Sequence, residues 1–249
     1  MRLFALLFIV CLFGAFAPAQ VPTPPSNATW LWHLDDNTGW KKCGGGCANV
    51  NDPKVYWFKQ GVSSPSIDGK AMEAYIEGCY DCWADDLFYY HLGAQNWATH
   101  MEYKFNFQWN APKTKQSNGH YVVQGMEFDA FWSENSFKYN LSSQCSYYQG
   151  YWGLWDPVNA DWKNISVPCP RWAPGSWHQI IWYVTRDPIA KTSTYVGLEV
   201  DGKQYWINHS TPALWTSWDD SSGVQFEQDT DRDGDPWYMW VDQVAVALW

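Results

Sequence analysis

Polar and apolar residues alternate one by one through much of this chain, and this two-residue period limits most strongly how it can fold. The alternation is clearest in residues 101–109, where every second residue is large and apolar and those between are polar or charged. Because successive side chains of a strand point to opposite faces, this pattern predicts a strand with one face on a core. Further β-rich runs occur at residues 177–185, 194–200, 203–208, 223–228 and 237–248, and no segment has the period of an amphipathic helix.

The residues between these runs are typical of turns. Asp201-Gly202 separates two runs, and an Asp-Gly pair commonly forms a two-residue hairpin turn. Many strands joined by Gly, Pro, Asn and Asp turns, without intervening helices, predict an all-β fold of two antiparallel sheets, a sandwich or jelly roll. We assign residues 30–249 to a single domain of this kind.

The N-terminus has the features of a secretory signal peptide. Arg2 precedes an apolar run that ends at Phe16, and Ala17-Pro18-Ala19 follows. The run is shorter than the roughly 18 apolar residues of a membrane-spanning helix. We therefore expect residues 1–19 to be removed, residues 20–29 to form a Pro-rich lead-in, and the protein to be secreted without a membrane span.

The cysteines indicate disulfides. Seven cysteines occur, and all but Cys11 follow the expected cleavage site. An even number in an exported chain is typical of disulfide bonding, although the sequence leaves the pairing open. The close spacing of Cys43 with Cys47 and of Cys79 with Cys82 suggests two local loops, which would leave the last two cysteines to close a longer one. The same two spacings would suit a zinc ion, but export and the glycine-rich spacer between Cys43 and Cys47 favour disulfides. The cysteines are Cys43, Cys47, Cys79, Cys82, Cys145 and Cys169.

Composition narrows the class of partner. The chain has 20 Trp, 15 Tyr and 12 Phe in 249 residues, more large rings than we expect one core to bury. Exposed rings suit a polysaccharide or oligosaccharide, whose C–H faces stack on indole and phenol. The net charge of -10 disfavours a nucleic-acid partner, because phosphate binding needs clustered Lys and Arg. Nothing in the sequence indicates the oligomeric state.

Several motifs resemble the concanavalin A-like and laminin-G-like jelly rolls. They are Trp177-His178-Gln179-Ile180, Val200-Asp201-Gly202, Gly223-Val224-Gln225-Phe226 and the closing C-terminal strand. More narrowly, the chain is similar to secreted bacterial laminin-G-like modules of a kind common in acidobacteria, through residues 64–69, 98–100, 144–145 and 168–170. The resemblance implies the jelly-roll fold without a particular activity, and it supports pairing Cys145 with Cys169.

Glu127 and Asp129 form the most informative pair of acids. Met126 and Phe128 have the parity of a core-facing row, so the two acids point to the other face, about 7 Å apart along the strand. Two carboxylates this close repel each other, so the pKa of one should rise, as acid–base chemistry requires.

The pair is similar to the E-x-D core of jelly-roll glycoside hydrolases such as laminarinases and cellobiohydrolases. That resemblance implies a retaining endo-β-glucanase with Glu127 as nucleophile, Asp129 assisting it, and a later Glu on the same strand as acid/base. Here the expected positions hold Phe131 and Trp132, and Glu134 has the wrong parity. Another strand would have to place an acid about 5–5.5 Å from Glu127. The candidates are Glu73, Glu77, Asp85, Asp86 and Glu199.

Three alternatives to catalysis stay open at this point. Glu-Phe-Asp also resembles the metal-binding strand of legume lectins, but residues 133–143 offer Glu134, Asn135 and Asn140 without the Asp and His of that family, which favours at most a calcium site. The acids could instead accept hydrogen bonds from sugar hydroxyls without chemistry. They could also be neutralised by Lys or Arg on a solvent-facing sheet.

A second candidate metal site follows the run at residues 223–228. Asp229, Asp231 and Asp233 occupy alternate positions before Gly234, as at the start of an EF-hand loop, but the twelfth position is Trp240 instead of Glu. The segment therefore predicts either a structural calcium ion or a solvated turn, and no cofactor is required.

Together these features predict a secreted jelly roll that recognises an extracellular polysaccharide of the β-glucan type through an aromatic, acidic concave face. A retaining glycoside hydrolase is the second hypothesis. An adhesion module that binds protein is the third, since laminin-G-like folds serve that role too. The rings expected to contact glycan are Tyr121, Phe131, Trp109, Trp132, Trp152 and Trp155, with Trp162, Trp215 and Trp218 as further candidates; Trp132 has core parity.

Overall fold

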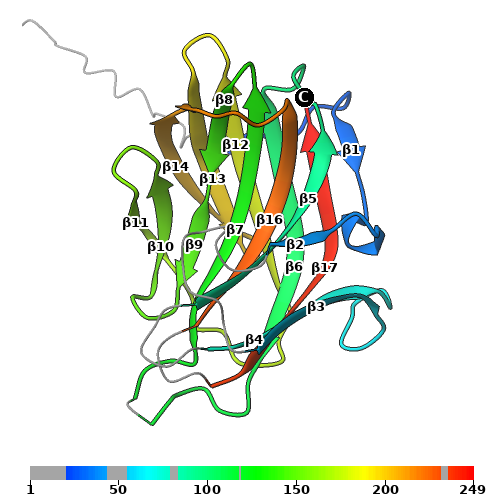
Figure 1. The fold of residues 1–249 in the computed structure, drawn as a ribbon, viewed down its shortest axis with the longest axis vertical. Helices are drawn as coiled ribbons and strands as arrows, with labels where there is room; N and C mark the ends of the chain where they lie inside the picture. The colour runs from blue at the N-terminus through cyan, green and yellow to red at the C-terminus, as the bar shows by residue number, and fades with distance from the viewer. Residues whose placement is uncertain (1–20, 44–54, 79–83, 118, 231–234) are drawn as a thin grey trace, which may run out of the picture.

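The computed structural model describes residues 21–43, 55–78, 84–117, 119–230 and 235–249, and strands dominate them. Within these ranges the 3-10 turn η1 (Leu34–Asp36) is the one helical element. The strands form two sheets of antiparallel neighbours that pack face to face (Figure 1). The predicted all-β sandwich is confirmed.

The eight-stranded sheet has the order β14-β13-β12-β6-β17-β4-β3, and β1 pairs with β17. Its strands are β1 (Thr29–Leu31), β3 (Val55–Val62), β4 (Ala71–Glu77), β6 (His100–Asn110), β12 (His178–Asp187), β13 (Thr192–Val200), β14 (Lys203–Pro212) and β17 (Trp237–Leu248). The alternating segment 101–109 is the centre of β6. Asp201 and Gly202, with φ of 49° and 80°, form the expected hairpin turn between β13 and β14.

The nine-stranded sheet has the order β11-β10-β9-β7-β16-β5-β2; in addition β8 pairs with β7, and β15 with β8. Its strands are β2 (Lys41–Cys43), β5 (Ala84–Gly93), β7 (Val123–Glu134), β8 (Phe137–Leu141), β9 (Ser143–Ser146), β10 (Tyr151–Asp156), β11 (Asp161–Pro168), β15 (Leu214–Trp215) and β16 (Ser221–Thr230). The segment with Glu127 and Asp129 thus lies in β7, with β16 on one side and β9 on the other.

Aromatic rings fill the space between the sheets. Phe105 of β6 meets Phe128 of β7 with ring centroids 4.7 Å apart, and Phe226 of β16 at 5.0 Å. Trp152 and Trp182 meet edge to face at 5.7 Å across the same core. Such contacts contribute about 0.5–1.5 kcal/mol each beyond the area they bury, so the rings fix how the two sheets align.

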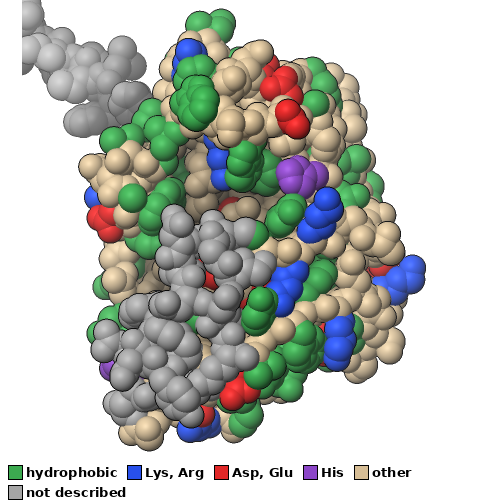
Figure 2. Space-filling view, in the orientation of Figure 1, with side chains coloured by type: hydrophobic (Ala, Val, Ile, Leu, Met, Phe, Trp, Pro, Cys, Tyr) green, Lys and Arg blue, Asp and Glu red, His purple; other side chains and the backbone are tan. Residues whose placement is uncertain are grey.

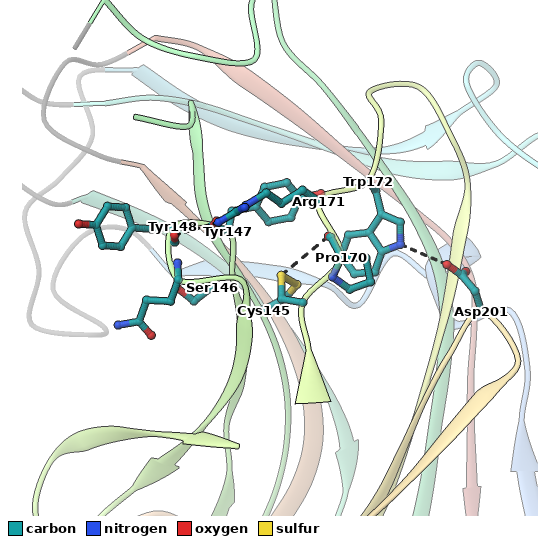
Figure 3. The surroundings of a disulfide bond; sticks show 10 residues. Cys145, Ser146, Tyr147, Tyr148, Pro170, Arg171, Trp172 and Asp201 are labelled. Carbon is teal, nitrogen blue, oxygen red and sulfur yellow. Dashed lines mark hydrogen bonds between the residues drawn. A yellow bond between two sulfur atoms is a disulfide. The ribbon is translucent and has the colours of Figure 1, made fainter. Parts of the chain in front are cut away.

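The disulfide between Cys145 and Cys169 joins β9 to the segment that follows β11 (Figure 3). Arg171 Nε then donates to the carbonyl oxygen of Tyr147 (3.1 Å), and Trp172 Nε1 donates to Asp201 (3.1 Å). The pairing that the family resemblance implied is confirmed. Cys43 is also disulfide-bonded. The remaining three, Cys47, Cys79 and Cys82, lie outside the described residues.

The N-terminal expectations fall partly outside the described residues, since residues 1–20 are not among them. Of the Pro-rich lead-in, Val21 is buried against Ile181, Tyr183 and Val196 on the outer face of the eight-stranded sheet. No helix in the described part of the chain is long and apolar enough to cross a membrane.

Candidate functional site

Strand pairing brings acids from two distant segments together on the nine-stranded sheet. Met126 and Phe128 of β7 lie in the core, so the alternating side chains of Glu127 and Asp129 point away from it. Glu227 of β16 pairs directly opposite Glu127. On the other side of β7, Gln144 of β9 is the partner of Glu127. We call Glu127, Asp129, Gln144, Glu227 and Asp229 the acidic face.

Three of these carboxyl groups form a close cluster. One oxygen each from Glu127, Glu227 and Asp229 lies within 4.8 Å of the others. The amide of Gln144 holds two of them, because its Nε2 donates to Glu127 (3.0 Å) and to Asp229 (2.8 Å). Gly125 makes the approach possible, since a Cβ at this position would lie 2.5 Å from Asp229 Oδ2.

Burial raises the pKa of every carboxyl in the cluster. For Glu127 the pKa rises well above its ordinary value, first through burial and then through repulsion by Asp229 and Asp129. Burial likewise raises the pKa of Glu227, with Glu127 as the next cause, and brings the pKa of Asp229 to about 7. The cluster therefore retains protons near neutral pH, so that a carboxyl able to donate lies beside one able to accept. The sequence predicted the rise from repulsion; burial is the larger cause.

Asp129 differs from its neighbours because both of its oxygens are used. Oδ1 accepts a hydrogen bond from the backbone N–H of Ser143 (2.9 Å), and Oδ2 accepts one from the amide of Gln225. Burial raises the pKa of Asp129 to about 6, and these two hydrogen bonds oppose the rise. A carboxylate that is buried and doubly bonded in this way is suited to holding its neighbours in place.

Glu227 and Asp229 supply the second carboxyl group that a retaining mechanism needs near Glu127. Neither was predicted in this role. The missed signal is a second E-x-D, Glu227-Gln228-Asp229, on a strand that pairs with the first. Of the five proposed acids, Asp85 of β5 is the one that belongs here: it pairs opposite Asp229 and raises the pKa of Glu127.

The other four acids lie elsewhere. Asp86 has the opposite parity on β5, and its carboxyl lies 4.0 Å from Lys42. The remaining three lie on the eight-stranded sheet, where each accepts a hydrogen bond from a neighbouring side chain: Glu73 from Trp240, Glu77 from Tyr75 and Glu199 from Gln204. As the acid/base partner of Glu127 these four predictions were wrong, because the acids belong to other faces.

Aromatic rings border the acidic face on the side of β10 and β11. Trp155 and Trp162 pair across these strands with ring centroids 5.3 Å apart. Gly153 of β10 is the neighbour of Gln144 and faces the same way. Its missing side chain leaves room for the Trp162 ring, to which a Cβ would come within 3.3 Å.

A second group of rings lies farther along β7. Phe131 lies over Gly223, and its ring centroid is 5.6 Å from that of His91 and 6.1 Å from that of Trp218. Trp218 is exposed, and Lys138 Nζ lies 4.2 Å from the centroid of its ring. In the view of Figure 2, hydrophobic side chains are interspersed with basic and histidine side chains. Both ends of the acidic face thus have aromatic neighbours.

Several rings expected to bind glycan have other places. Trp109, Trp132 and Trp152 are 3%, 1% and 0% exposed in the core, and Phe131 is 3% exposed beside Trp218. None of these four rings can stack on a sugar, so these four predictions were wrong. Each of the three tryptophans in the core lies in an alternating row whose other members are core residues. Tyr121 precedes β7, where Lys115 and Arg171 lie 5.1 and 4.7 Å from its ring centroid.

The predicted metal ligands lie in different parts of the structure. Asp229 belongs to β16 and bonds Gln144, while Asp231 and Asp233 lie outside the described residues, so the calcium loop stays a prediction. The lectin-like ligands are engaged within the protein: Glu134 pairs with Arg186, and the Asn140 amide donates to Ser142 (2.9 Å). Besides Glu127, Glu227 and Asp229, the described residues contain one further group of three acids, Asp35, Asp36 and Asp68.

Comparisons with known proteins bear on the fold. Neither a known protein family nor a curated protein sequence matches the chain. Among solved structures, an alginate lyase from Aplysia kurodai is similar with a TM-score of 0.51 and 13% identity, over 78% of this chain and 91% of that one. An endo-β-1,4-glucuronan lyase from Trichoderma reesei gives 0.47 and 14%, over 84% and 94%. Lectin II from Ulex europaeus gives 0.41 and 12%, over 84% and 97%. The sheet order and the similarity to the alginate lyase together show that the chain has the concanavalin-like jelly-roll fold.

Proposed function

We propose that this chain is a secreted protein that binds a neutral polysaccharide of the β-glucan type on the acidic face. The observation that carries the proposal is the cluster of Glu127, Glu227 and Asp229, held by Gln144 between two sets of aromatic rings. Carboxyl and amide groups exchange hydrogen bonds with sugar hydroxyls, and indole rings cover the C–H faces of the same sugars. Secretion is supported by the signal-peptide pattern that the sequence predicts at residues 1–19 and by the disulfide.

Charge favours a neutral glycan over an anionic one. The chain carries a net charge of -10, and three acids lie within 4.8 Å of one another on the proposed surface. A polyuronate such as alginate would bring a carboxylate with every sugar, and the buried, largely protonated cluster offers no counter-ion for the water that this charge would lose. A β-glucan carries hydroxyls alone and meets no such penalty.

Affinity electrophoresis tests this proposal. The protein is run in gels that contain a soluble β-glucan, alginate or no polysaccharide. We expect β-glucan to retard the wild type, Trp162→Ala to abolish the retardation, and Trp206→Ala, at an exposed position on β14 of the other sheet, to leave it unchanged. The proposal is overturned if only alginate retards the protein, or if neither polysaccharide does.

A retaining glycoside hydrolase is the second candidate function, and one observation favours it. Glu127 and Glu227 are paired directly opposite each other with carboxyl oxygens within 4.8 Å, close to the separation of about 5–5.5 Å that double displacement uses. Glu127 would attack the anomeric carbon while a protonated Glu227 donates its proton to the departing glycosidic oxygen. Water would then release the sugar from Glu127 as Glu227 takes back a proton.

Release of reducing ends from β-glucan distinguishes binding from hydrolysis. If the chain is a hydrolase, Glu127→Gln and Glu227→Gln should each lower the rate by about 100-fold or more, because each removes a reacting group. Glu199→Gln, on the outer face of the eight-stranded sheet, is the matched control and should keep the wild-type rate. Binding without any release of reducing ends would leave the chain as a glycan-binding protein.

A further inference from the structure

A cavity opens where an edge of one sheet meets an edge of the other. Its volume is about 360 Å³, and its walls come from β1, from η1 and the turn after it, and from the end of β5. The lining residues include Trp30, Trp32, Asn37, Tyr90 and His91. A volume of this size lies within the usual range of small-ligand sites.

Two stacked indole rings form one wall of this cavity. Trp30 lies in β1 and Trp32 follows the last residue of that strand, with ring centroids 4.3 Å apart and planes 8° from parallel. Trp32 is 55% exposed, so water covers much of its ring when the cavity is empty. An ordered, exposed indole pair offers a flat apolar surface without a large cost in side-chain entropy, since each ring already restrains the other.

His91 connects the cavity with the rings beside the acidic face. It lines the cavity, and its ring centroid lies 5.6 Å from that of Phe131, which in turn contacts Trp218. Burial and then Lys41 lower the pKa of His91, so its imidazole is neutral at pH 7 and can both donate and accept a hydrogen bond. The exposed side chains of His91 and Trp218 therefore offer a glycan that crosses the acidic face a hydrogen-bonding group and a ring on the side of the cavity.

The chemistry of the walls selects an uncharged ligand with both apolar and hydroxyl surfaces. Among the described residues that line the cavity, none is an Asp, Glu, Lys or Arg. A charged group would therefore lose its water without gaining a counter-ion. Asn37 and His91 offer hydrogen bonds at the rim, while the indoles and Tyr90 offer stacking surfaces. A neutral sugar ring has this combination of surfaces.

We propose that the cavity between β1 and β5 is a remote glycosyl subsite, in which Trp32 stacks on one sugar of a neutral glycan whose chain extends past Trp218 to the acidic face. This subsite rests on the proposed function. It specifies where a further sugar binds, that Trp32 contacts this sugar, and that affinity depends on the length of the glycan. Short oligosaccharides fill the acidic face alone, and longer ones gain affinity when a sugar reaches Trp32.

Calorimetry with gluco-oligosaccharides of increasing length tests the subsite. For the wild type we expect affinity to rise with length and then to level off once the cavity is filled. Trp32→Ala should bind the shortest ligands as the wild type does and lose about tenfold or more in affinity for the longest. Trp32→Phe should retain part of the gain. Trp206→Ala, which removes an exposed ring from β14 at the far edge of the eight-stranded sheet, should behave as the wild type throughout.

The outcomes separate this inference from the proposed function. If short and long ligands bind equally well, or if Trp32→Ala weakens all lengths equally or none, the subsite is refuted while glycan binding stands. If oligosaccharides of every length fail to bind, both the subsite and the proposed function are refuted. Because Trp32 lies largely in solvent, its replacement should keep the wild-type melting temperature, and an unchanged melting curve excludes unfolding as the cause of lost affinity.

Discussion

Two glycines determine how closely side chains approach each other on the nine-stranded sheet. At Gly125 a Cβ would lie 2.5 Å from Asp229 Oδ2 and 3.0 Å from the amide of Gln144. At Gly223 it would lie 2.6 Å from the Phe131 ring and equally close to the backbone oxygen of Tyr90. The first neighbours are ends of side chains that can move, whereas the second set includes main chain.

Replacing these glycines by alanine should therefore have unequal costs. Gly125→Ala should displace Asp229 and lower the free energy of unfolding by roughly 1–3 kcal/mol. Gly223→Ala should cost more than Gly125→Ala, because the carbonyl of Tyr90 belongs to a strand ladder and cannot rotate away. Urea unfolding of the two variants at one pH compares them, and the reverse order would contradict this account.

At the scale of elements, the Cys145–Cys169 bond closes the segment that contains β10 and β11. The two cysteines are 24 residues apart, and a loop of that length restricts the unfolded chain by about 3.5 kcal/mol in the loop-entropy model. Trp155 and Trp162 lie within this loop, on β10 and β11. The bond thus supports one aromatic border of the acidic face.

Removal of this disulfide should destabilise the fold without removing any ring. We expect the double variant Cys145→Ser with Cys169→Ser to lose roughly 2–4 kcal/mol in free energy of unfolding. Urea titration in the absence of reductant measures the loss while the other cysteines stay oxidised. A loss below about 1 kcal/mol would mean that the native contacts alone hold β9 to the segment after β11.

Strands could be predicted from the sequence, but the partners of their side chains could not. Alternation identified β6 and placed Glu127 and Asp129 on the face of β7 opposite to Met126, because parity is a local property of a strand. The position of Glu227 depends on the register between β7 and β16, which are separated in sequence by some 90 residues. No local pattern encodes that register. Trp109 and Trp152 were misplaced for a related reason, since the core holds more rings than composition suggested.

At the scale of the whole molecule, acids that are buried away from the acidic face make stability depend on pH. Asp86 is buried with neither oxygen hydrogen-bonded to a described residue, and burial raises its pKa to about 7. Burial also raises the pKa of Glu102, on the eight-stranded sheet, to about 7. In the unfolded chain both groups lose their protons near pH 4. Between about pH 4 and 7 the folded state therefore binds more protons, so stability falls as the pH rises through that window.

Asp86→Asn should flatten this dependence. Each group of this kind changes the free energy of unfolding by up to about 1.4 kcal/mol per pH unit between its two pKa values. We expect the variant to match the wild type near pH 4 and to exceed it in stability at pH 8. Urea unfolding across this range measures both curves. Parallel curves would show that Asp86 ionises normally in the folded protein.

The register between β7 and β16 determines which groups face each other on the acidic face, independently of which side chains fill the core. If β16 slipped by two residues, every apolar side chain would still point inward, because side-chain direction repeats with that period. Glu127 would then face Gln225 or Asp229 in place of Glu227, so the opposing group would be an amide or a shorter acid. Jelly rolls with nearly the same interior can thus differ in whether two long acids meet, and the reactivity of such a surface can diverge while the sandwich beneath it stays the same.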